Sequence, residues 1–145
     1  MKKLGLILTL IAIGFVLPIS LSAQQSAEYY LKKGISFSSS QKYQEAFEEF
    51  DKAYKLDSKD PNIIAFRGQS LHFLKRYQEA IENYNMALKI QPDYAEVYHL
   101  RGLARYELKD LDGACEDWEQ ANKLGFDMVI DLIIEYCMKN KTEKK

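Results

Sequence analysis

Apolar residues downstream of residue 26 recur at steps of three and four, which is the spacing of an amphipathic helix. In residues 43–56 the apolar positions alternate with Glu and Lys, so one face is apolar and the opposite face is charged. Pro61, Pro92 and Gly125 interrupt the pattern, and helices are expected to end there. The pattern predicts six helices in three pairs: 27–39 with 41–56, 62–74 with 76–90, and 95–108 with 111–124.

The three helix pairs are copies of one unit, because the same residue types return every 34 positions. Small residues form three of the repeating columns and large apolar residues form the other three. The columns are Gly34, Gly68 and Gly102; Ala46, Ala80 and Ala114; Ala53, Ala87 and Ala121; Tyr43, Tyr77 and Leu111; Phe50, Tyr84 and Trp118; and Tyr30, Ile64 and Tyr98. Small residues allow paired helices to approach closely, and the large aromatic of each unit fills the space beside that contact. Stacked units then bury one continuous core.

This unit resembles the tetratricopeptide repeat (TPR) family. The resemblance rests on the 34-residue period and on the residue order Ile64, Gly68, Tyr77, Ala80, Tyr84, Ala87 and Pro92. Ser58 replaces the usual closing proline and Leu111 replaces the usual tyrosine, which affects only local turns. The resemblance implies an all-α, right-handed helical solenoid of three TPR helix pairs, with repeats at about 27–60, 61–94 and 95–126.

A further apolar segment follows the third repeat at about 127–138, and a basic tail occupies 139–145. The end of a solenoid would otherwise expose the apolar face of its last repeat. We therefore expect 127–138 to form a capping helix that completes a TPR domain at 24–138. Residues 113–125 and 135–137 also resemble the closing segment of exported bacterial TPR proteins.

The two cysteines of the chain, Cys115 and Cys137, lie at similar distances on either side of the turn at 122–128. If the cap runs antiparallel to the preceding helix, the two side chains face each other. In an oxidising compartment a disulfide would close a loop of about 20 residues and add about 3 kcal/mol of stability. The alternative is a pair of buried thiols that act as small apolar residues.

The first 23 residues have the pattern of a secretory signal peptide. Lys2 and Lys3 precede an apolar run at 4–21, and small residues follow it. Cleavage after Ser22 or after Ala23 fits the pattern, and the product would be periplasmic or secreted, with no membrane insertion. An uncleaved anchor is the alternative, because the apolar run is just long enough to cross a bilayer.

Composition leaves few candidates for chemistry. The 20 Lys and Arg nearly balance the 21 Asp and Glu, so no basic field exists to bind nucleic acid. His72 and His99 lie on neighbouring first helices, about 10 Å apart along the helix axis, which is too far to share a metal ion. Cys115 has no histidine in its helix to activate it as a nucleophile. We therefore expect no metal, no cofactor and no catalysis, and a cryptic site on the histidine surface is the remaining enzymatic interpretation.

In the TPR family the first helices line a concave groove that binds peptides, and the resemblance carries this groove over position by position. The groove residues it implies are Leu31, Ile35, Gln69, His72, Phe73, His99, Leu103 and Tyr106. Family members that hold a C-terminal carboxylate use a clamp of Lys, Arg and Asn. The matching positions here lack this clamp, because they hold Leu31, Ile35, Phe66, Glu96 and Leu100. For Leu31, Ile35, Phe73 and Tyr106, ligand contact and packing between helices are equally good interpretations of the sequence.

The sequence thus predicts a non-catalytic module that binds a protein or peptide in the cell envelope. Repeat folds suit this role because a long, rigid concave face limits the ordering cost of binding. The alternative is an accessory structural subunit of an envelope assembly that docks by its convex or flat surface. The sequence favours no particular oligomeric state.

Overall fold

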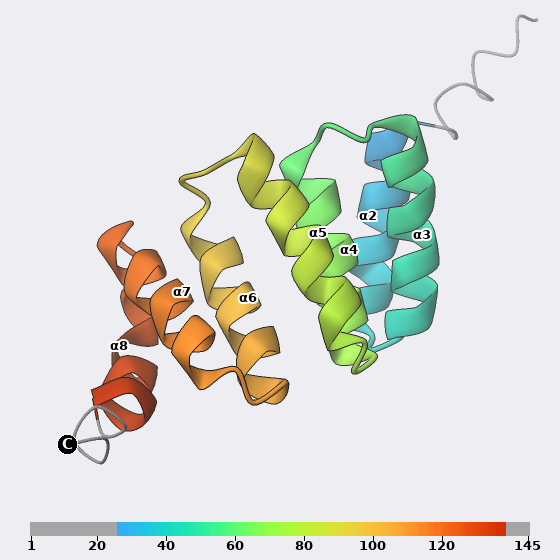
Figure 1. Cartoon of the computed structure of the whole chain (residues 1–145). Helices are drawn as coiled ribbons and strands as arrows, with labels where there is room; N and C mark the ends of the chain where they lie inside the picture. The colour runs from blue at the N-terminus through green and yellow to red at the C-terminus, as the bar shows by residue number, and fades with distance from the viewer. Residues whose placement is uncertain (1–25, 139–145) are drawn as a thin grey trace, which may run out of the picture.

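The computed structural model describes residues 26–138, and every regular element in this part of the chain is a helix. α2 (Ala27–Ser39) pairs with α3 (Tyr43–Leu56), α4 (Pro61–Phe73) with α5 (Tyr77–Ile90), and α6 (Ala95–Glu107) with α7 (Leu111–Lys123). The pairs stack in chain order, with α3 against α4 and α5 against α6 (Figure 1). The predicted all-α solenoid is confirmed, and each helix begins and ends within two residues of its predicted position.

Two predicted segments, the signal peptide at 1–23 and the basic tail at 139–145, lie outside the described residues. Among the helices that are described, none combines the length and the apolar character needed to cross a membrane.

The recurring glycines mark the closest approach between paired helices. A methyl group on Gly34 would lie 2.5 Å from the ring of Phe50, and one on Gly102 would lie 2.5 Å from the indole nitrogen of Trp118. Both rings are completely buried. The sequence pattern predicted that each ring fills space beside a contact between small residues, whereas in the structure the ring itself lies against the glycine. The period thus pairs each glycine with the large aromatic residue 16 positions later.

Two positions after the end of each first helix lies a residue with left-handed backbone geometry, and none of these residues is glycine. They are Gln41, Lys75 and Lys109, with φ of 58°, 61° and 67°. The following amide bonds back to the last turn, as Arg76 N does to Leu71 O at 2.9 Å. These residues also follow the 34-residue period, so the repeat contains a helix-ending turn that the hydrophobic pattern did not show.

A periodic set of polar side-chain contacts joins the repeats, and the apolar pattern did not predict it. Its basic members share one repeat position: Lys33, Arg67 and Arg101. Their acceptors in the second helix of the same repeat are Glu49, Asn83 and Asp117. Arg67 also bonds Asp51, and Arg101 also bonds Asn85, in the second helix of the preceding repeat. All of these positions are 34 residues apart, a signal that a search of apolar columns alone does not detect.

The segment after the third repeat covers α7, but it is not one regular helix. It begins as a 3-10 turn (η1, Asp127–Val129), continues as one α turn (α8, Ile130–Leu132) and ends as a π-helix (η2, Ile133–Met138). Cys137 is buried here and forms a disulfide with Cys115 of α7, with 5.6 Å between the Cα atoms. This bond joins the two cysteines for which the sequence predicted a disulfide.

Candidate functional site

The candidate groove is formed by the first helices α2, α4 and α6, which lie side by side along the solenoid (Figure 1). All eight predicted groove residues are on these three helices, but their surroundings differ. Four of them are accessible on the groove surface, and three are held in contacts with the C-terminal part of the domain. The eighth, His72, lies against the rings of Phe73 and Tyr77 within its own repeat.

Ile35 and Phe73 are the most accessible apolar residues of the groove, with exposed fractions of 38% and 47%. Phe73 stacks on Tyr43 of α3 with 4.4 Å between ring centroids, so its orientation is set while much of its surface stays open. Leu31 and Gln69 are half-buried. These side chains can contact a ligand without any unpacking of the core.

Leu103 and Tyr106 contribute mainly to packing. Both contact the buried cluster around Trp118 and Cys137, and the Tyr106 ring lies 4.9 Å from the ring of Tyr136 in the cap. His99 stacks on Phe126 at 5.2 Å, in the turn between α7 and the cap. For these three residues the structure favours the packing interpretation.

The two histidines influence each other electrostatically. Burial lowers the pKa of His72, and the nearby Glu107 carboxylate partly offsets this effect. Burial also lowers the pKa of His99, and a positive charge on His72 lowers it further. Both imidazoles therefore favour the neutral form. In the described part of the chain, no group of three or more His, Cys, Asp and Glu side chains is arranged to hold a metal ion.

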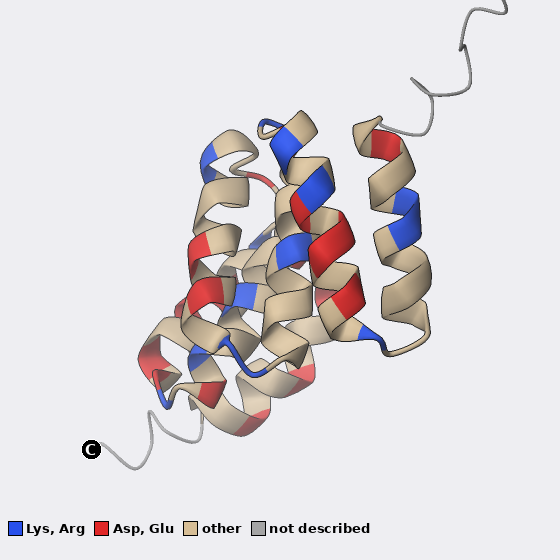
Figure 2. Ribbon diagram, turned by 90° about the vertical axis from the view of Figure 1, so that its right-hand side faces the viewer, with Lys and Arg blue, Asp and Glu red and all other residues tan. Residues whose placement is uncertain are grey.

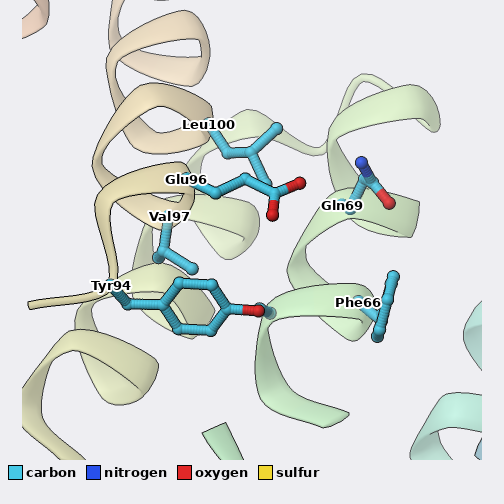
Figure 3. A pocket seen from close by; sticks show the side chains of 7 residues that line it. Phe66, Gln69, Tyr94, Glu96, Val97 and Leu100 are labelled. Atoms are coloured by element: carbon cyan, nitrogen blue, oxygen red, sulfur yellow. The ribbon is translucent and has the colours of Figure 1, made fainter. Parts of the chain in front are cut away.

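A shallow hollow, partly open to solvent, lies between the N-terminal halves of α4 and α6. Its lining residues are Ala65, Phe66, Gln69, Tyr94, Glu96, Val97 and Leu100 (Figure 3). Tyr94 precedes α6, and its hydroxyl donates to Asn62 Oδ1 at 2.9 Å, which ties the start of α6 to the start of α4. In the sequence, residues 91–94 mark only a break between two repeats, and the pattern does not predict that Tyr94 lines a hollow.

A second accessible feature lies on the second helices. Three aliphatic residues at the same repeat position are exposed at or just beyond their C-terminal ends: Leu56, Ile90 and Leu124. Their exposed fractions are 54%, 46% and 36%. This stripe is the apolar surface that a partner docking outside the groove would use.

Family comparisons agree with the helix-pair architecture. The family model described as tetratricopeptide repeat matches residues 27–60, and a model described as TPR repeat matches residues 68–109. No curated protein matches the chain at a significant level.

Solved TPR domains share the fold. The first TPR of Spaghetti (RPAP3), bound to the HSP90 peptide SRMEEVD, is 28% identical, with 70% of this chain and 80% of that chain covered and a TM-score of 0.67. The first TPR domain of human RPAP3 has 27% identity, the same coverage and the same TM-score. The second human RPAP3 domain, in complex with the HSP70 peptide SGPTIEEVD, has 25% identity, 68% and 82% coverage and a TM-score of 0.66. With its 34-residue helix pairs and these matches, the chain belongs to the tetratricopeptide repeat family.

Proposed function

We propose that the chain is a non-catalytic TPR module of the cell envelope, which binds an extended segment of a partner protein in the groove of α2, α4 and α6. The observation that carries this proposal is the accessible apolar surface at Ile35 and Phe73, together with the hollow between α4 and α6. Exposed apolar surface beside a preformed hollow is typical of a binding site.

Similarity to peptide-bound domains supports the same role. Two of the similar solved domains hold peptides from HSP90 and HSP70. A groove built from rigid helices lets an extended peptide bind with little reorganisation of the protein. The proposal extends this mode of binding, and not the identity of those peptides, to the present chain.

The proposed location rests on two features of the sequence and structure. The first 23 residues have the order of a signal peptide, with basic, apolar and small residues in turn. Disulfides persist in oxidising compartments, and Cys115 and Cys137 form one. We therefore place the mature protein in the periplasm or outside the cell.

Site-specific photocrosslinking in the producing cell tests the groove. A photoreactive residue is placed at Ile35 or Phe73 in the groove and at Glu48 or Glu82 on exposed positions of the second helices α3 and α5. We expect a defined partner band at the groove positions and none at Glu48 and Glu82. A band restricted to Glu48 and Glu82 would contradict groove binding.

The second candidate function is an accessory subunit that docks by the stripe of Leu56, Ile90 and Leu124. The regular exposure of these three aliphatic residues favours it. Crosslinkers at Leu56 and Ile90 distinguish this function from groove binding. Docking by the stripe should give a partner band at these two positions and no band at Ile35 and Phe73.

A further inference from the structure

The charged residues at the groove positions of the repeats are all acidic. The family resemblance places Glu28, Glu96 and Glu107 at such positions, and it places no Lys or Arg there. Glu28 is paired with Lys32 at 2.6 Å. Neither Glu96 nor Glu107 has a Lys or Arg partner among the described residues.

Many carboxylates outside the groove are paired with a neighbouring base. On the helices that face the viewer in Figure 2, Lys and Arg positions lie close to Asp and Glu positions. Lys55 pairs with Asp51, and Arg76 pairs with Glu79. Glu96 has no such partner in the described part of the chain, so its charge is available to a ligand.

The hollow combines an apolar wall with this acidic group. Phe66, Val97 and Leu100 form the wall, and Tyr94 closes one end through its bond to Asn62. Figure 3 shows the Glu96 carboxylate extending from α6 toward Gln69 on α4, across the opening. Burial and the charges of Glu96 and Asp60 raise the pKa of the Tyr94 hydroxyl.

A long side chain with an apolar stem and a cationic end fits these features together. The stem of Lys or Arg packs against aliphatic surface while its charged head remains near solvent or a carboxylate. A Glu or Asp side chain in the same place would lie against Glu96 with no compensating base, and like charges at that distance repel.

We propose that the hollow between α4 and α6 binds a lysine or arginine side chain of an apolar peptide segment, with its cation at Glu96. This inference rests on the proposed function of the groove. A basic ligand side chain would also distinguish this groove from those of the two similar peptide-bound RPAP3 domains, whose peptides end in Glu-Glu-Val-Asp.

The test uses a phage library of random 12-residue peptides, panned against the purified protein with its disulfide intact. We expect the enriched peptides to share a Lys or Arg next to aliphatic residues. A synthetic consensus peptide with blocked termini is then measured by fluorescence anisotropy. Its affinity should fall roughly tenfold for Glu96→Gln, which is the usual size of a lost charge-assisted contact, and should weaken as salt rises. The matched control Glu82→Gln, on an exposed position of α5, should leave the affinity unchanged.

Exchanging the charges of Glu96 and of the peptide's basic residue tests whether these two groups contact each other. The Glu96→Lys variant should bind the consensus peptide poorly and should regain affinity for the same peptide with its Lys or Arg replaced by Glu. Equal binding of the consensus peptide by wild type and Glu96→Gln would overturn the inference. Enrichment of acidic peptides whose binding falls in Phe73→Ala would also overturn it, but would leave the groove function standing. If no peptide is enriched, both proposals fail.

Discussion

At the scale of single residues, the fold depends on three glycines that each lie against a buried ring. In a helix interior, glycine is usually unfavourable relative to alanine by about 1 kcal/mol. At these positions the balance reverses, because a methyl group would enter the space of a ring that has no room to move. The same residues that look like weak points of each helix are thus required by its packing.

Gly102→Ala should lower the free energy of unfolding by about 1–2 kcal/mol, because overpacking against Trp118 exceeds the gain in helix propensity. Gly68→Ala is the graded comparison, since its methyl group would meet the Tyr84 ring at 2.9 Å instead of 2.5 Å. Urea unfolding followed by circular dichroism measures both. A Gly102→Ala protein more stable than wild type would contradict the close contact.

The histidines predict a pH dependence of stability. Burial lowers the pKa of His72 and His99 in the folded protein, so the unfolded chain binds protons more strongly than the folded one. The free energy of unfolding should therefore fall as pH drops through the usual histidine range, from about 7 to about 5.

The His72→Gln, His99→Gln double variant should flatten this part of the stability profile, measured by urea unfolding at several pH values. Carboxylates contribute in a separate range. Burial alone would raise the pKa of Glu49, but hydrogen bonds and charges from Lys52 and Lys33 outweigh burial, so the pKa is lowered. The stability that Glu49 contributes is therefore lost only at more acidic pH. A profile between pH 7 and 5 that is equally steep in both proteins would rule out the histidines as its cause.

At the scale of helices, the 34-residue unit includes the way each first helix ends. Gln41, Lys75 and Lys109 adopt positive φ, which costs a residue with a side chain about 1 kcal/mol or more. Gly125 takes the same role at the end of α7 without that cost. The helix ends are thus geometrically alike, and only one has the residue type that favours the geometry.

Lys75→Gly should raise the free energy of unfolding by about 0.5–1 kcal/mol, because it removes the left-handed strain and leaves the bond from Arg76 N to Leu71 O in place. Gly125→Ala should lower it by a similar amount, since nothing lies within 4 Å of the added methyl group and only the backbone is strained. Thermal unfolding of the two variants should shift in opposite directions. Shifts of the same sign would contradict this account.

At the scale of the whole molecule, the solenoid is closed at one end by an irregular cap that is tied to α7. The cap changes from 3-10 to α to π geometry within twelve residues, so its own backbone bonding gives it little independent stability. Tyr136, Val129 and the Cys115–Cys137 disulfide hold it against the third repeat. The cap therefore depends on the domain more than the other helices do.

The Cys115→Ala, Cys137→Ala protein should lose about 3 kcal/mol of unfolding free energy, the entropy of closing a loop with a sequence separation of 22. Reducing agent should lower the stability of the wild type by a similar amount. The double variant is the control for the reductant, because its unfolding curve should not change. Identical curves for oxidised and reduced wild type would show that the disulfide does not stabilise the domain.

The sequence by itself determined the helix pairs and their order. These features depend on contacts within one repeat or between consecutive helices, and such contacts leave a period of apolar and small residues in the chain. The sequence also placed Cys115 and Cys137 on neighbouring segments, and the structure decided between a disulfide and two buried thiols. Groove positions could be carried over from the family resemblance for the same reason.

Only the tertiary structure decided which polar groups meet across repeats. Arg67 bonds Asp51 and Tyr94 bonds Asn62, and each contact depends on how one repeat is rotated against the next. That rotation follows from the packing of whole helix faces, which no single position encodes. The hollow beside Glu96 and the contact of Tyr106 with the cap also depend on the packing of whole elements, so the detailed shape of the groove could not be predicted from the repeat pattern.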